Sequence, residues 1–316
     1  MPPSTDPPSH RVATVALVAL ATLTAFLSVY ALWVRAQLLD GPTWADTSTR
    51  IVQDEQVRRE LAASLAARLT DNRTVRDELG PLLINVPAEQ VDAVRGQLRT
   101  AIEREAFRGL GTAPVARLWR ASNLEAQREL VRILDGDREG VTVRGGRVTV
   151  DLRPLLRRLG RQVGLPDSLV GLVPARDARL VVMRSSDLVV AQDIVRTVRD
   201  LSVVLPAVTV LLWLLALALG RSRRRVIVMQ IGLGLIVAGV GVLLTRALAG
   251  DAVVFALVER PSQRGAGDQV WALGTSLLRD GGLAVLVAGV VLLGGAALVG
   301  NGRWLLNRED ETALLG

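Results

Sequence analysis

Carboxylates are the side chains of this chain that could do acid–base chemistry or bind a metal ion. The densest group is the run from Asp135 to Glu139, which places three carboxylates within five positions. Clustered oxygen ligands are typical of calcium loops, but Arg138 lies inside this run and the glycine and glutamate spacing of an EF-hand is missing. We therefore expect a solvated turn there. Two further carboxylate pairs stand out, Asp54 with Glu55 and Asp77 with Glu78.

The residue types that are absent exclude several kinds of catalytic and metal-binding site. All 38 are arginine, the chain has no lysine and no cysteine, and its single histidine is His10. The sequence therefore excludes a thiol nucleophile, a disulfide, a Schiff-base lysine, a Walker-A lysine and a Cys or His zinc site. Gly160, Gly164 and the other glycines fit no dinucleotide-binding pattern. We expect no enzymatic activity, no cofactor and no bound metal ion.

Long apolar segments must position these charged residues. Half of the chain is apolar and its mean hydropathy is +0.34, although 22% of the residues are charged. A helix needs about 20 apolar residues to cross a hydrocarbon core of ~30 Å, at about 1.5 Å per residue. Four uncharged segments meet this length, and we predict transmembrane helices at residues 12–34, 201–219, 226–244 and 281–299.

Arginine predicts the orientation of these helices, because basic residues beside membrane spans stay on the cytoplasmic side. The short turn at 220–225 carries four of them and should contact anionic headgroups of the inner leaflet. These residues are Arg221, Arg223, Arg224 and Arg225.

We therefore expect a multi-pass plasma-membrane protein with both termini in the cytoplasm. Residues 1–11 form a disordered Pro-rich tail and residues 300–316 a second tail. Residues 35–200 and 245–280 then lie outside the cell. A cleaved signal peptide is the alternative at the N-terminus, but the apolar segment is long for one and no small-x-small site follows it.

The external segment 35–200 has mainly helical periodicity. Apolar residues recur every three or four positions, which is the pattern of an amphipathic helix. By contrast, the Gly145–Gly146 pair lies between two alternating runs at 141–150, which predicts a β-hairpin, and 180–183 is expected to add a third strand. The predicted fold is an α+β domain with helices at 51–69, from Pro87, at 112–120, after Ser122 and at 152–163.

A helix that begins at Ser185 or Ser186 should continue to Leu219. About half of it would stand outside the bilayer, so it would couple the external domain rigidly to the second span. In the loop 245–280, Asp268 is expected to cap a short helix through Leu278. The sequence leaves open whether this loop lies on the membrane surface or re-enters it.

The membrane spans contain no charged side chain, which argues against a proton-coupled transporter. Gln230 is expected to hydrogen-bond a neighbouring helix. Small residues in the third and fourth spans permit close helix packing, either within the chain or in a homo-oligomer. These residues are Gly232, Gly234, Gly239, Gly241, Ala284 and Ala288.

Several segments together resemble a known type of protein. They are the juxtamembrane Trp44 with the following helix pattern 51–57, the segment 148–152, the segment 182–192, and Leu201–Pro206 ahead of a span and an arginine turn. This layout resembles a family of uncharacterised actinobacterial integral membrane proteins with one large extracytoplasmic domain. The resemblance implies a location in the cell membrane and a similar topology. It implies no activity and no site residues.

The leading functional interpretation is a non-enzymatic, envelope-associated protein that binds or scaffolds a partner through its external domain. The partner would be membrane lipid, an envelope protein or a lipid ligand. Nucleic acid is not expected, because acidic residues are interleaved with the arginines and the domain faces outward. A lipid or small-molecule transport accessory with a cavity in the external domain is the alternative. A hydrolase that uses only Asp, Glu, Ser and Arg is the third interpretation.

Overall fold

We describe the protein from a computed structural model. The chain divides into two compact units. Unit 1 comprises Met1–Ala36, Asp193–Ala249 and Thr275–Gly316, and unit 2 comprises Gln37–Gln192 and Gly250–Gly274. The structure describes residues 8–71, 88–136, 141–144, 147–151, 179–220, 223–258 and 263–313.

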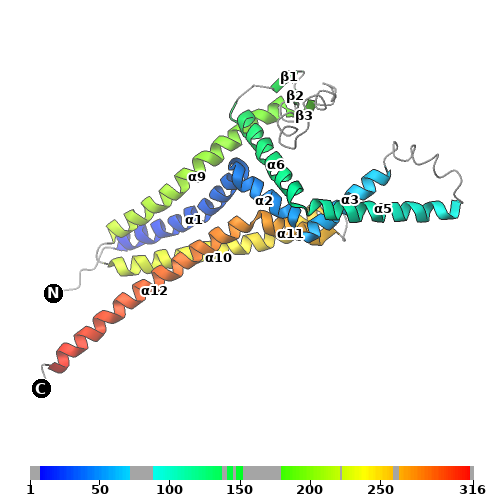
Figure 1. Ribbon diagram of the computed structural model, residues 1–316. Helices are drawn as coiled ribbons and strands as arrows, with labels where there is room; N and C mark the ends of the chain where they lie inside the picture. Colours follow the sequence, from blue (N-terminus) through cyan, green and yellow to red (C-terminus); the bar gives the residue numbers. More distant parts are fainter. Residues whose placement is uncertain are drawn as a thin grey trace. The chain divides into compact units, whose positions relative to one another are not determined.

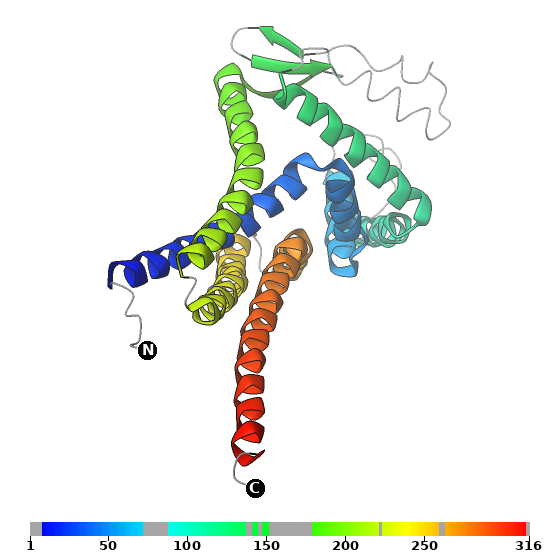
Figure 2. The same cartoon turned by 90° about the vertical axis from the view of Figure 1, so that its left-hand side faces the viewer.

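Unit 1 is built on four long apolar helices (Figure 1). Each contains a stretch long and apolar enough to cross a membrane, at Val12–Leu39, Leu188–Leu219, Arg224–Ala256 and Ser276–Leu298. The chain thus has the architecture of an integral multi-pass membrane protein, and the four predicted segments all lie within these helices. The helices are α1 (Pro8–Leu39), α9 (Ser185–Leu219), α10 (Arg224–Leu257) and α12 (Ser276–Ala313). Figure 2 shows α12 as one continuous helix.

Glycine brings α10 and α12 into backbone contact. A Cβ atom placed on Gly239 would lie 2.7 Å from the carbonyl oxygen of Gly282. Seven residues away along each helix, a Cβ atom on Gly289 would lie 2.6 Å from the carbonyl oxygen of Gly232. Only glycine leaves room for such an approach, which in lipid supplies packing that the hydrophobic effect does not.

The opposite side of α10 packs against α1 and α9. The buried apolar side chains of this contact include Val18 on α1, Ala216 on α9 and Ile231 on α10. A hydrogen bond of 2.9 Å between the hydroxyl groups of Thr24 and Thr209 also joins α1 to α9. Each hydroxyl therefore finds a partner inside the apolar bundle, which avoids the cost of burying an unpaired polar group.

Two arginines bound the apolar part of α10. At its first turn, Arg225 Nε donates to the carbonyl oxygen of Ala296 on α12 at 2.9 Å. Near the other end, Arg246 Nε donates to Thr275 Oγ1 at 2.8 Å. The two arginines are 21 positions apart, a rise of about 32 Å, close to the ~30 Å of a hydrocarbon core. Arg225 also ties the start of α10 to the end of the apolar stretch of α12, so both lie at the same end of the bundle.

Unit 2 consists mainly of paired helices. α2 packs against α6, α3 packs against α5, and α11 contacts both α2 and α3 (Figure 1). The bounds are α2 (Gly41–Gln53), α3 (Glu55–Asp71), α5 (Ala88–Leu110), α6 (Ala113–Leu134) and α11 (Arg264–Gly274).

The expectation of one helix over 51–69 was wrong, because the chain breaks at Asp54. This residue has extended backbone angles, φ −62° and ψ 137°. Its Oδ1 accepts hydrogen bonds from the backbone N–H groups of Gln56 and Val57 at 2.9 and 3.2 Å. Asp54 is therefore the N-cap of α3, and the cap separates α3 from α2.

Two further helix boundaries differ from the sequence expectation. The segments 112–120 and 123–134 form one helix, α6, so Ser122 is an interior residue and caps nothing. The expected helix from Asp268 to Leu278 is divided: α11 ends at Gly274, and α12 begins at Ser276. The helix expected at 152–163 lies outside the described residues.

The described chain also contains three short strands, β1 (Val141–Arg144), β2 (Arg147–Asp151) and β3 (Arg179–Arg184). They pair antiparallel in the order β1–β2–β3, and the register of the second pair shifts between Val148 and Thr149. The residues predicted as a hairpin and a third strand are the ones that pair. The Gly145–Gly146 turn lies outside the described residues.

Candidate functional site

The predicted arginine turn is only partly described. Arg223 and Arg224 are exposed, while Arg225 is bound to α12 through the carbonyl oxygens of Ala296 and Ala297. Arg221 lies outside the described residues. Arg225 therefore connects two helices, whereas Arg223 and Arg224 remain accessible for contact with anionic headgroups.

The small residues predicted to pack helices divide into three groups. Gly232 and Gly239 face α12, and Gly234 and Gly241 face Thr22 and Phe26 on α1. The third group, Ala284 and Ala288, is exposed on α12. Gln230, which we expected to hydrogen-bond another helix, is half-buried and makes no hydrogen bond within the described part of the chain.

The carboxylates singled out from the sequence do not gather at one place. Asp54 is a helix cap, and Asp135 is the C-cap residue of α6. Within the described ranges, no group of three or more His, Cys, Asp or Glu side chains could hold a metal ion. Asp77, Glu78, Asp137 and Glu139 lie outside those ranges. Among the described carboxylates singled out from the sequence, Glu55 lines a groove that is discussed below.

Three glutamine side chains donate hydrogen bonds to backbone carbonyl groups at helix C-termini, which no local sequence pattern indicated. In unit 2, Gln37 Nε2 donates to the carbonyl oxygen of Gly274, the last residue of α11, at 3.0 Å. The carbonyl groups in the last turn of a helix lack intrahelical partners, so an amide N–H satisfies one of them. The other two bonds join Gln127 to Leu38 at 3.0 Å and Gln192 to Ile133 at 3.1 Å.

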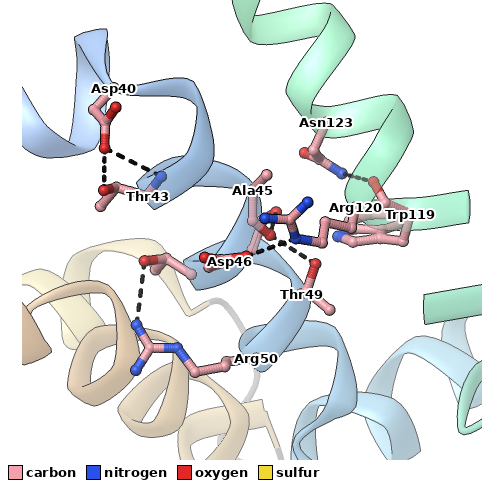
Figure 3. A network of polar contacts seen from close by, with 11 residues as sticks. Asp40, Thr43, Ala45, Asp46, Thr49, Arg50, Trp119, Arg120 and Asn123 are labelled. Atoms are coloured by element: carbon pink, nitrogen blue, oxygen red, sulfur yellow. Dashed lines mark hydrogen bonds and ion pairs between the residues drawn. The ribbon is translucent and has the colours of Figure 1, made fainter. Parts of the chain in front are cut away.

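Polar side chains also fix the pairing of α2 with α6 (Figure 3). Arg120 Nε on α6 donates to Asp46 Oδ1 on α2 at 2.6 Å. Ahead of α2, Asp40 Oδ2 accepts from the backbone N–H of Thr43 at 3.3 Å and from its hydroxyl group, which caps the helix. The Arg120–Asp46 pair is 45% and 58% exposed. An exposed pair of this kind contributes little stability and mainly selects the register of the two helices.

A groove of about 340 Å³ lies between α3 and α5. Residues spaced by about one helical turn line it, because positions i, i+3, i+4 and i+7 share one face of a helix. The lining residues are Glu55, Arg59 and Ala62 from α3, and Thr100, Glu103, Arg104 and Phe107 from α5. The groove opens to solvent and is a candidate binding site.

Some charged side chains of the groove have ion-pair partners and others have none among the described residues. On α3, Arg59 binds Glu55 at 2.6 Å, so these two groups neutralise each other. On α5, Glu103 is half-buried and Arg104 is exposed, and neither forms an ion pair or a hydrogen bond with any described residue. Thr100 donates its hydroxyl proton to the carbonyl oxygen of Gly96 at 2.9 Å. The groove therefore presents one negative and one positive group without partners, from neighbouring positions of one helix.

The floor of the groove is apolar and held in place. Ala62 is fully buried and lies beneath the groove. The guanidinium carbon of Arg58 lies 4.8 Å from the centre of the Phe107 ring, which is the geometry of a cation–π contact. Arg58 Nε is buried and has no hydrogen-bond partner in the described structure. Because α5 ends only three residues after Phe107, at Leu110, the positive charge of Arg58 also lies near the negative end of that helix.

Comparisons with known proteins supply no analogue for this site. No protein-family model, no curated protein and no solved structure matches the chain. The site is therefore interpreted from its own geometry.

Proposed function

We propose that this protein is a non-enzymatic binding protein of the cell envelope, anchored by the four membrane helices and acting through unit 2. The groove between α3 and α5 is the observation that carries the proposal. A volume of about 340 Å³ lies within the range of small-molecule sites, and such sites combine an apolar surface with a few placed polar groups. Phe107 provides the apolar surface, and Glu103 and Arg104 provide the polar groups.

A hydrolase is less well supported by the same residues. Glu55 and Glu103 both line the groove, so a carboxylate pair is present. However, Glu55 is 67% exposed and bound to Arg59, which is the setting of a surface ion pair rather than of a desolvated catalytic acid. The open groove also favours recognition at the surface over the enclosed cavity expected of a transport accessory.

The arginine pattern supports the proposed location. With the turn that contains Arg223 and Arg224 in the cytoplasm, both termini are cytoplasmic and unit 2 lies outside the plasma membrane. The turn then lies beside anionic lipid headgroups. Helix α9 is unbroken over 35 residues, or about 52 Å, and Pro206 does not end it. We propose that this helix transmits binding outside the cell to the membrane bundle.

Native mass spectrometry of the full chain, extracted gently from its own membrane, tests the binding function. The test compares the wild type with the double variant Glu103→Gln/Arg104→Gln. The matched control is Glu105→Gln/Arg99→Gln, which changes the same residue types on α5 at positions that do not line the groove. We expect a co-extracted species with the wild type and the control, and its loss from the groove variant. A species retained by all three proteins, or found with none, contradicts the proposal.

A further inference from the structure

The two unpartnered charges of the groove restrict the ligand that it can take. A half-buried carboxylate has lost part of its hydration, and a bound cation restores a favourable interaction. Glu103 meets this description, because it is half-buried and unpaired in the described structure. A positive group that enters the groove should therefore lie at Glu103.

Arg104 favours a negatively charged group in the ligand. Its guanidinium is exposed at the edge of the groove and has no carboxylate partner in the described structure. A guanidinium binds a carboxylate through two parallel hydrogen bonds, which are stronger than bonds between neutral groups. Glu55 cannot serve as that carboxylate without giving up its own contact of 2.6 Å with Arg59. A negative group of the ligand is therefore expected at Arg104.

The Phe107 ring limits what lies between the two charged groups of the ligand. The Phe107 ring already carries the Arg58 guanidinium, so the ring does not need a cationic ligand to pair with it. An apolar ring favours a compact, uncharged connection between the two charged groups of the ligand. The volume of about 340 Å³ suits a molecule of about the size of a dipeptide.

From these observations we infer that the groove binds a zwitterion of about dipeptide size, with its ammonium group at Glu103 and its carboxylate at Arg104. This inference rests on the proposed binding function and adds the chemical class of the ligand. A ligand with only an ammonium group or only a carboxylate would leave either Arg104 or Glu103 without a partner in the groove. Selectivity should therefore depend on both termini of the ligand.

Three simple probes test the inference on the full chain in lipid nanodiscs, with binding followed by isothermal titration calorimetry. The probes are glycylglycine, N-acetylglycylglycine, which lacks the ammonium group, and glycylglycinamide, which lacks the carboxylate. We expect glycylglycine to bind best and each blocked probe to bind on the order of tenfold more weakly, because each loses one charged hydrogen-bonding group.

Two variants test which side chain binds which charged group of the ligand. In Glu103→Gln, the preference for glycylglycine over its N-acetyl form should disappear, while the preference over the amide remains. In Arg104→Gln, the preference over the amide should disappear instead. Glu105→Gln and Arg99→Gln should retain both preferences, and circular dichroism checks that each variant keeps its helices. Equal binding of the three probes, or no binding of any, overturns the zwitterion inference. The proposed function still stands in that case if the co-extracted species is lost from the groove variant.

Discussion

Single amide groups decide how several helix ends of unit 2 are held. Gln37, Gln127 and Gln192 each donate to a carbonyl oxygen in the last turn of a helix. Gln37 and Gln127 are buried, at 8% and 7% exposure, so each amide depends on its carbonyl partner for a hydrogen bond. A helical periodicity alone marks such a glutamine as a polar residue on an unspecified face. Its partner lies far away in the sequence, and only the folded chain reveals it.

Loss of the Gln127 amide should destabilise unit 2. The substitution Gln127→Leu removes the amide that donates to the Leu38 carbonyl oxygen. We expect the free energy of unfolding to fall by about 0.5–1.5 kcal/mol, the net contribution of one hydrogen bond. Thermal unfolding of the detergent-solubilised protein, followed by circular dichroism, measures the change. The control is Gln97→Leu on the exposed face of α5. Equal melting temperatures for the two variants would refute this function of Gln127.

At the scale of elements, the same residue type has two different environments in the membrane helices. Gly239 and Gly289 lie against the backbone of a neighbouring helix, whereas a Cβ atom on Gly294 would meet no atom within 4 Å. Glycine lowers the intrinsic stability of a helix by roughly 0.5–1 kcal/mol relative to alanine. Close packing of α10 against α12 offsets this cost at the first two positions.

Substitution of these glycines should therefore have opposite effects. Gly239→Val would place a branched side chain against the Gly282 carbonyl oxygen and force α10 away from α12. Such overpacking costs typically about 1–3 kcal/mol, so the temperature of aggregation in mild detergent should fall. Gly294→Ala is the control on α12 and should leave that temperature unchanged or raise it slightly. A stable Gly239→Val protein would show that the close contact is unnecessary.

The whole molecule combines a membrane bundle with a second compact unit. Hydrogen bonds at the ends of the bundle show the relative direction of neighbouring membrane helices. Arg225 joins α10 to α12 at one end, while Arg35 Nη1 donates to Ser202 Oγ at 3.2 Å and joins the end of α1 to α9. These contacts define antiparallel neighbours. The arginine pattern predicts which side of the membrane each end of the bundle faces.

The absence of cysteine from the chain permits a direct test of this orientation. We expect Gln97→Cys, in unit 2, to react with a membrane-impermeant maleimide added to intact cells. Arg223→Cys, in the turn before α10, should react only after the cells are opened. Both side chains are exposed, so access to the reagent and not burial controls labelling. The reverse pattern would place unit 2 in the cytoplasm.

The sequence by itself determined the number and approximate position of the membrane helices, because length and continuous apolar character are local properties. It also indicated which residues pair in the three strands. The break at Asp54 could have been recognised from its capping position, but the apolar stripe continues across it and obscured the signal. Only the tertiary structure placed Glu103 and Arg104 in a groove opposite Glu55 and Arg59, because that placement depends on the register of α3 against α5. Packing between distant segments sets this register, and no local pattern in the chain encodes it.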